Sequence, residues 1–137
     1  MNSFPLTIVT PDGLQYEGTA EELVVRTTTG DLGVLAGHAN CVAPLGMGRA
    51  TIVANGKKLY AACIGGILSV LNGQVKLVPT TFEWADKIDV TRAEASAQRA
   101  RAILAEKGVS AVDTKIAEAR LRRANVRKSV AELIKKY

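Results

Sequence analysis

The strongest constraint on the fold of this chain is a change of sequence period near Trp84. Before residue 82, apolar residues come in short runs separated by turn-forming residues, as in residues 6–9 and 23–26. After Trp84, apolar residues recur every three or four positions, and Ala, Arg, Lys and Glu dominate. A period of two is typical of strands, and a period near 3.6 of helices. The sequence therefore predicts an α+β chain, with a β-sandwich or flattened barrel of about ten short strands over residues 1–85 and an antiparallel two-helix hairpin over residues 86–137.

Two Asn-Gly pairs give the clearest local signals in the first part. Asn55-Gly56 separates the apolar runs 51–53 and 59–61, and Asn72-Gly73 separates runs 67–70 and 75–78. Two-residue hairpin turns require positive φ at both central positions, which Asn and Gly tolerate. Both pairs therefore predict β-hairpins.

The second part contains two helix starts. Residues 91–94 fit a capping box, in which the Thr91 hydroxyl and the Glu94 carboxylate bind the free amides of the first turn. Residues 110–113 offer a similar start after the break at Gly108. These signals predict helices over about residues 91–106 and 111–135, and the short connection predicts that they form the hairpin.

The apolar faces of these helices predict a weakly packed hairpin. Because small residues bury little area, the predicted contact stabilises the hairpin only slightly, and an alternative packing on a neighbouring subunit can compete with it. One arginine interrupts the seam of the second helix. The predicted face of the first helix is Ala93, Ala97, Ala100 and Leu104, and the predicted seam of the second is Val112, Ile116, Ala119, Arg123, Val126, Val130 and Leu133.

Charge is distributed unevenly between the two parts. Residues 1–85 carry five basic and six acidic side chains, whereas residues 86–137 carry 13 basic and seven acidic ones. An anionic partner is therefore expected at the hairpin. A basic nucleic-acid-binding module is the alternative interpretation, although aromatic residues make up only 4% of the chain and form no base-stacking stripe. With one histidine, His38, and no nucleophile or metal-ligand pattern, the sequence does not predict an enzyme.

Other features bear on the compartment. The N-terminal residues lack the pattern of a signal peptide, and no apolar run is long enough to span a membrane, so a cytoplasmic location is expected. Cys41 and Cys63 lie among apolar residues without metal-ligand spacing, which favours buried, reduced thiols.

Five segments, in order and spacing, resemble the epsilon-subunit family of bacterial F-type ATP synthases. The resemblance extends over essentially the whole chain, including the switch from strands to helices. The last segment resembles the family's ATP-binding motif, I/L-D-x-x-R-A. The segments are IVTPDG (8–13) with Tyr16, GDLGVLAGH (30–38), APL (43–45), GGIL (65–68) and IDVTRA (88–93).

This resemblance implies a non-catalytic rotor subunit that requires no cofactor. Its sandwich would bind the gamma subunit and the ring of c-subunits, completing the central stalk of a proton- or sodium-translocating enzyme. Its hairpin would be a mobile regulatory domain that folds back, or extends into the alpha/beta hexamer and inhibits ATP hydrolysis. The resemblance also implies a peripheral location on the cytoplasmic face of the cell membrane, without membrane insertion and without nucleic acid as a partner.

The resemblance further implies a regulatory ATP site. Arg92 and Arg99 are seven residues apart and share a helix face, and guanidinium groups suit polyphosphate because they form bidentate hydrogen bonds. No phosphate-binding Gly-rich loop or Mg²⁺ carboxylate set is present, so the site would sense ATP rather than hydrolyse it. The alternative is that these arginines form a solvated helix face. The implied ATP-binding residues are Glu83, Ile88, Asp89, Arg92, Ala93, Arg99, Arg123 and Arg127.

Two loop residues of the first part are expected at subunit contacts by the same resemblance. Asp31 lies in the segment that would meet the polar loops of the c-ring, and His38 follows a glycine in the next loop. For His38 a structural role, with its ring bonded to the backbone, is an equal alternative.

Overall fold

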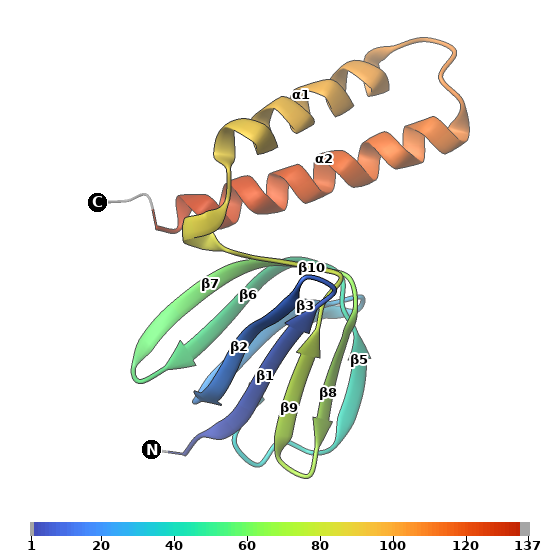
Figure 1. Ribbon diagram of the computed structural model, residues 1–137. Helices are drawn as coiled ribbons and strands as arrows, with labels where there is room; N and C mark the ends of the chain where they lie inside the picture. Colours follow the sequence, from blue (N-terminus) through green and yellow to red (C-terminus); the bar gives the residue numbers. More distant parts are fainter. Residues whose placement is uncertain (1, 135–137) are drawn as a thin grey trace. The chain divides into compact units, whose positions relative to one another are not determined.

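The computed structural model describes residues 2–134, and the chain divides into two compact units, Met1–Trp84 and Ala85–Tyr137 (Figure 1). The first unit consists of strands and the second of helices, so the predicted fold class is confirmed. The change of architecture coincides with the change of sequence period.

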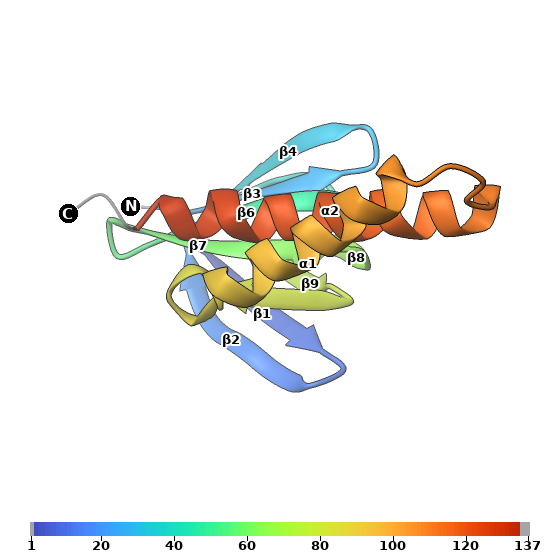
Figure 2. The same cartoon turned by 90° about the horizontal axis from the view of Figure 1, so that it is seen from above.

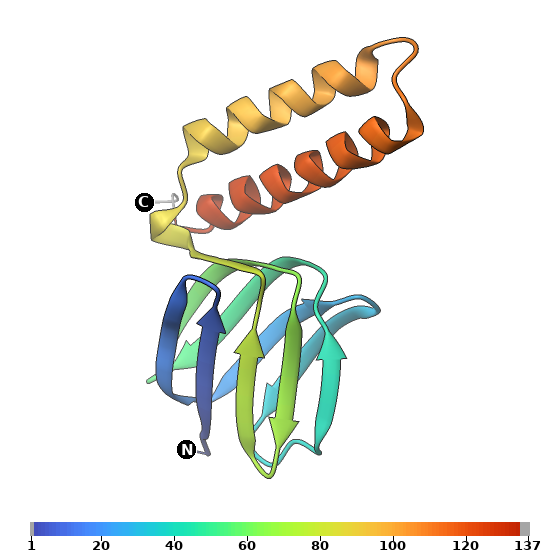
Figure 3. The same cartoon turned by 45° about the vertical axis from the view of Figure 1, so that its right-hand side comes forward.

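Ten strands form two five-stranded sheets in the first unit (Figure 3). The strand order is β2-β1-β9-β8-β5 in one sheet and β10-β7-β6-β3-β4 in the other. Most neighbours pair antiparallel, but β1 and β9 are parallel, with Leu6 opposite Val75 and Ile8 opposite Leu77. The strands are β1 (Phe4–Thr10), β2 (Gly13–Ala20), β3 (Glu22–Thr27), β4 (Gly30–Leu35), β5 (Cys41–Pro44), β6 (Met47–Ala54), β7 (Lys57–Ile64), β8 (Ile67–Leu71), β9 (Gln74–Val78) and β10 (Thr81–Trp84).

The sandwich core is built from large aliphatic side chains that alternate along the strands. In β1, Phe4, Leu6 and Ile8 are buried while the residues between them are more exposed, which is the period of two expected for a strand with one covered face. The same alternation places Leu68 and Val70 of β8 in the core. Six large side chains, Leu6, Ile8, Leu23, Ile52, Leu68 and Leu77, are almost completely buried.

Both predicted Asn-Gly hairpins are present. Asn55 and Asn72 have φ of 53° and 51°, and the following glycines also have positive φ. Side chains from other segments hold both turns. The Glu21 carboxylate accepts a hydrogen bond from Gly56 N at 3.0 Å, and Asn40 Oδ1 accepts one from Asn72 N at 2.8 Å.

The sandwich ends at an aromatic cluster. Phe82 and Trp84 of β10 pack edge to face with ring centroids 4.9 Å apart, and Tyr16 of β2 lies 6.3 Å from Trp84. Edge-to-face packing is a favoured arrangement of aromatic rings, and Phe82 is buried in the sandwich core while Trp84 is partly buried against it.

The second unit is an antiparallel hairpin of α1 (Val90–Ala105) and α2 (Ala111–Glu132), preceded by the short 3₁₀ helix η1 (Ala85–Lys87) (Figure 2). The predicted start of α2 is confirmed, because Ser110 Oγ accepts a hydrogen bond from Asp113 N at 3.1 Å. The predicted capping box at Thr91 is wrong. Asp89 is the N-cap of α1, and its Oδ1 accepts a hydrogen bond from Arg92 N at 3.0 Å. A carboxylate is favoured there because it also faces the positive end of the helix dipole.

The helix contact consists mainly of alanines, and the predicted seam on α2 is wrong. Val112 and Ile116 of that seam are 67% and 43% exposed, and Val130 is its one fully buried member. Closely approaching helices favour small residues on both sides, so the heptad-spaced alanines of α2 are buried, while the larger seam residues other than Val130 are half-buried or exposed. The buried alanines are Ala93, Ala97 and Ala100 of α1 and Ala117, Ala124 and Ala131 of α2.

Candidate functional site

The four arginines of the expected nucleotide site belong to the helical unit. Arg92 and Arg99 are exposed on α1, and Arg123 and Arg127 are half-buried on α2. Arg123 lies outside the alanine rows, so it does not interrupt the helix contact as the predicted seam required. A charge at this position therefore costs little, because it need not be buried between the helices.

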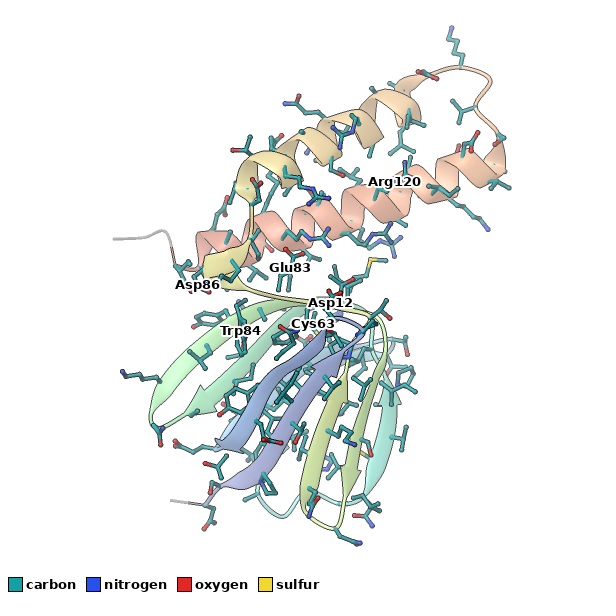
Figure 4. All side chains as sticks on the ribbon, in the orientation of Figure 1. Asp12, Cys63, Glu83, Trp84, Asp86 and Arg120 are labelled. Carbon is teal, nitrogen blue, oxygen red and sulfur yellow. The ribbon has the colours of Figure 1, made fainter. Side chains whose placement is uncertain are left out.

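The remaining expected ATP-site residues have distinct local environments. Asp89 already accepts a backbone hydrogen bond as the N-cap of α1, Ile88 is half-buried, and Ala93 is buried at the helix contact. Glu83 lies on β10 and belongs to the sandwich unit (Figure 4). The nucleotide role of all eight residues stays a prediction.

Helix geometry places the arginines of both helices on one side of the hairpin. At about 100° per residue, Arg92 and Arg99 lie on one flank of the alanine row of α1, and Glu94 and Arg101 lie on the other flank. Glu94 forms an ion pair with Lys128 of α2, which identifies the flank of α2 on the same side. The opposite flank of α2 carries Arg120, Arg123 and Arg127. The hairpin thus has an arginine side, defined by Arg92, Arg99, Arg120, Arg123 and Arg127, and an ion-pair side, defined by Glu94, Arg101 and Lys128.

Sequence reasoning missed Arg120 and the whole ion-pair side. Arg120 is exposed on α2 (Figure 4). It lines a hollow of about 450 Å³ at the loop end of the hairpin, together with Lys107, Gly108 and Ser110. The seven-residue spacing of Glu94 and Arg101 is visible in the sequence, but the approach of Lys128 depends on the register of the two helices. The sequence analysis predicted no such register, and its seam on α2 was wrong.

The ion-pair side contains a titratable group with a clear shift. The pKa of Glu94 lies below its ordinary value, first because Lys128 donates a hydrogen bond to its carboxylate and then because of the nearby Arg101 guanidinium. In the sandwich, burial raises the pKa of the Cys63 thiol to about 12. That thiol is therefore a structural group and not a nucleophile. Both cysteines are free, and Cys41 is half-buried.

The two loop residues expected at subunit contacts already have partners within the sandwich. Asp31 Oδ1 lies 3.4 Å from Arg26 Nη1, and both side chains are largely exposed. His38 Nδ1 lies 2.7 Å from the carbonyl oxygen of Ala39, and the backbone N of His38 donates to Leu35 O at 3.1 Å. These bonds fit the structural alternative for His38, and a subunit contact by either residue stays a prediction.

Within the described range 2–134, no group of three or more His, Cys, Asp or Glu side chains could hold a metal ion. None of the helices in that range combines the length and apolar character needed to cross a membrane.

Both units match known protein domains. Residues 3–85 match the family described as ATP synthase, Delta/Epsilon chain, beta-sandwich domain, and residues 86–132 match ATP synthase, Delta/Epsilon chain, long alpha-helix domain. Two solved structures share the fold. One, from the Euglena gracilis mitochondrial ATP synthase (OSCP/F1/c-ring), has a TM-score of 0.82 and 24% identity, covering 97% of this chain and 82% of that chain. The other, from the Tetrahymena thermophila mitochondrial ATP synthase (central stalk/c-ring), has a TM-score of 0.61 and 14% identity, covering 93% of this chain and 95% of that chain.

Whole-chain relatives agree with the domain matches. The ATP synthase epsilon chain of Shouchella clausii is 38% identical over 96% of this chain and 97% of its own length. The ATP synthase epsilon chain of Bacillus pumilus is 39% identical over 96% of this chain and 98% of its own length. Because both domains match in order and the relatives align from end to end, this chain belongs to the ATP synthase delta/epsilon chain family, as an epsilon chain without catalytic function.

Proposed function

We propose that this epsilon chain is a rotor subunit in the central stalk of an F-type ATP synthase. In this proposal, residues 1–85 bind the gamma subunit and the c-ring, and residues 86–137 regulate ATP hydrolysis. The observation that carries the proposal is the division into two units, each with its own core and its own family match. The solved structures with the same fold come from assemblies named for F1, the c-ring and the central stalk, which supports these partners.

The sandwich offers an apolar surface for such a partner. The outer face of the β2-β1-β9-β8-β5 sheet exposes Val42 by 71%, Ile67 by 49% and Val78 by 41%. The pairing places Ile67 between Pro44 of β5 and Val78 of β9, so the patch is continuous across three strands. A contiguous apolar patch on a soluble domain is typical of a protein contact, and we assign it to the gamma subunit. Asp31 and His38 would contribute polar contacts to neighbouring stalk subunits.

The hairpin suits a regulatory role because its helices are held by small side chains. In our proposal, the closed hairpin permits ATP hydrolysis, and an extended hairpin reaches the alpha/beta hexamer and inhibits it. ATP would favour the closed form by binding on the arginine side, where four of the five arginines match the residues expected for the site. The sequence pattern, the charge of this side and its separation from the acidic Glu94 support this assignment.

Deletion of the hairpin tests the division of labour. A chain ending at Asp86 should fold, bind gamma and support ATP synthesis in the reconstituted enzyme, while ATP hydrolysis increases. The full chain in the same preparation is the control. If hydrolysis is unchanged in an enzyme that is otherwise latent, the hairpin is not the inhibitory part.

Titration calorimetry tests the nucleotide site. Arg92→Ala should weaken ATP binding by the full chain about ten- to a hundredfold, since it removes one charge-assisted interaction of roughly 1.5 to 3 kcal/mol. Arg122→Ala is the matched control, because Arg122 is an exposed arginine of α2 directed away from the helix contact. Equal affinities of the wild type and Arg92→Ala would remove Arg92 from the site.

The subunit would be a peripheral component on the cytoplasmic face of the cell membrane. Affinity purification separates this proposal from a nucleic-acid-binding role for the basic hairpin. Recovery of gamma, alpha and beta subunits supports the stalk assignment, whereas recovery of RNA or DNA without them contradicts it.

A further inference from the structure

Three charged side chains join the two helices on the ion-pair side of the hairpin. The Glu94 carboxylate of α1 pairs with the Lys128 ammonium of α2 through one oxygen, and its other oxygen lies 3.6 Å from Arg101 Nη1. The side chains of Glu94 and Lys128 are 38% and 27% exposed, so both are partly sheltered. One carboxylate thus receives two cations, one from each helix.

This cluster lies far from the loop that connects the two helices. A loop joins α1 to α2 at one end of the hairpin (Figure 3). Glu94 is the fifth residue of α1 (Val90–Ala105), so it lies near the opposite end of that helix. From Glu94 to the end of α1 at Ala105 the helix rises about 16 Å. When the helices separate about the loop, the Glu94 end moves farthest, so a bond there resists opening most effectively.

The contact between the cluster and the loop is weak. Between Glu94 and the loop, the fully buried side chains of α1 are Ala97 and Ala100, each of which removes little apolar area from water. A surface ion pair changes an equilibrium by at most about fivefold, which is small beside a large aliphatic core. Beside an alanine contact, the same factor is a substantial share of the balance between closed and open hairpins.

We infer that the Glu94–Lys128 pair, steadied by Arg101, is an ionic latch that holds the hairpin closed independently of nucleotide. The arginine side, where we propose that ATP binds, lies across the alanine rows from the latch. Nucleotide and latch therefore act on opposite edges of the same helix contact and contribute separately to closure. The consequence for ATP hydrolysis rests on the proposed function of the hairpin, whereas the latch itself does not.

Thiol labelling of the full chain measures the opening directly. Ala100 is 1% exposed at the helix contact, so a cysteine introduced by Ala100→Cys reacts only when the helices separate. Cys41 is replaced by alanine, and Cys63 is kept as an internal reference because its buried thiol reports opening of the sandwich. Labelling at each position is followed by peptide mass spectrometry without nucleotide.

We expect the effects of the two substitutions on the labelling rate to be non-additive in a double-mutant cycle. Glu94→Gln and Lys128→Gln should each accelerate labelling at position 100 by up to about fivefold, and the double variant should label no faster than the faster single variant. Arg101→Gln should have a smaller effect. Raising the salt concentration to 1 M should accelerate labelling of the wild-type pair but not of Glu94→Gln, because the Debye length falls to about 3 Å.

Glu118→Gln is the matched control, since it removes the same charge from an exposed position of α2. The latch is overturned if Glu94→Gln labels at the wild-type rate, if the two single effects multiply, or if Glu118→Gln gives the same acceleration. Faster labelling of Cys63 in Glu94→Gln would also overturn it, because the effect would then reach the sandwich.

ATP hydrolysis by the reconstituted enzyme separates the two proposals. Under the proposed function, Glu94→Gln favours the extended hairpin and lowers hydrolysis. If labelling at position 100 accelerates while hydrolysis is unchanged, the latch stands and the regulatory role of the hairpin fails. If hydrolysis falls while labelling is unchanged, the latch is overturned.

Discussion

The sandwich and the hairpin are both closed by apolar contacts, but the side chains that make these contacts differ in size. The sandwich buries leucine, isoleucine and phenylalanine from two facing sheets, whereas the fully buried positions of α1 are all alanines. Hydrophobic stabilisation scales with the apolar area removed from water. We therefore expect the sandwich to be more stable than the helical hairpin, because its buried side chains are larger.

The largest expected effect comes from removing volume in the sandwich. Leu23→Ala should cost about 2 to 5 kcal/mol, because Leu23 is fully buried and the cavity cannot collapse completely. Trp84 is the single tryptophan of the sequence and lies in the sandwich, so its fluorescence during urea unfolding reports this unit. Leu14→Ala, at a position 57% exposed, is the control and should change stability by less than about 0.5 kcal/mol. Similar losses in both variants would contradict the assigned core.

Adding volume to the hairpin should have the next largest effect. Ala97→Leu should separate the helices and destabilise the hairpin by about 1 to 3 kcal/mol, because Ala97 is completely buried at the close contact. The melting temperature measured by circular dichroism at a helix wavelength should fall, while the transition measured by Trp84 fluorescence should not shift. Ala102→Leu on the exposed face of α1 should be neutral. A stabilising effect of Ala97→Leu would show that the contact is not close-packed.

The caps of the two helices should contribute about equally. Asp89→Ala and Ser110→Ala should each cost about 1 kcal/mol of hairpin stability, since each removes an acceptor for a first-turn amide. Thr91→Ala tests the correction to the capping residue and should cost much less. Helix content measured against temperature decides the order, and a larger loss for Thr91→Ala would restore the capping box inferred from the sequence.

Acid should weaken the hairpin. The pKa of Glu94 is lowered in the folded hairpin from its ordinary value of 4.5, so its stabilising contribution is complete above that value. As pH falls from 4.5 through the lowered pKa, protonation removes the attraction to Lys128 and Arg101 and the contribution is lost. Melting of the wild type and Glu94→Gln between pH 7 and pH 3 should show a smaller pH dependence in the variant. An identical dependence would exclude Glu94.

The smallest expected effect is that of Arg123→Leu without nucleotide. Because Arg123 lies outside the alanine contact, its replacement should change hairpin stability by no more than about 0.5 kcal/mol. In the presence of ATP, the wild type should gain stability and the variant should gain less, if the guanidinium binds phosphate. Thermal melts with and without ATP measure both quantities, and an equal gain in the variant would remove Arg123 from the site.

Local sequence signals predicted those features that depend on neighbouring residues. The Asn55 and Asn72 turns have the positive φ that their sequence requires, and Ser110 caps α2 as expected. By contrast, β2 (Gly13–Ala20) has no regular apolar alternation, and its place in the sandwich depends on pairing with β1. The cap of α1 was misplaced because Asp89 and Thr91 are both acceptable capping residues two positions apart.

The sequence by itself determined the class of each part of this protein, because the apolar period is a property of consecutive residues. Only the tertiary structure decided the parallel pairing of β1 with β9 and the face of α2 that meets α1. The sequence analysis predicted a seam of larger side chains on α2, whereas a heptad row of alanines is buried there in the structure. The buried face of α1 also consists of alanines, so the two helices meet through small side chains. The Glu94–Lys128 pair follows from this packing, since the rotation of α2 about its axis decides which charged side chains border the contact.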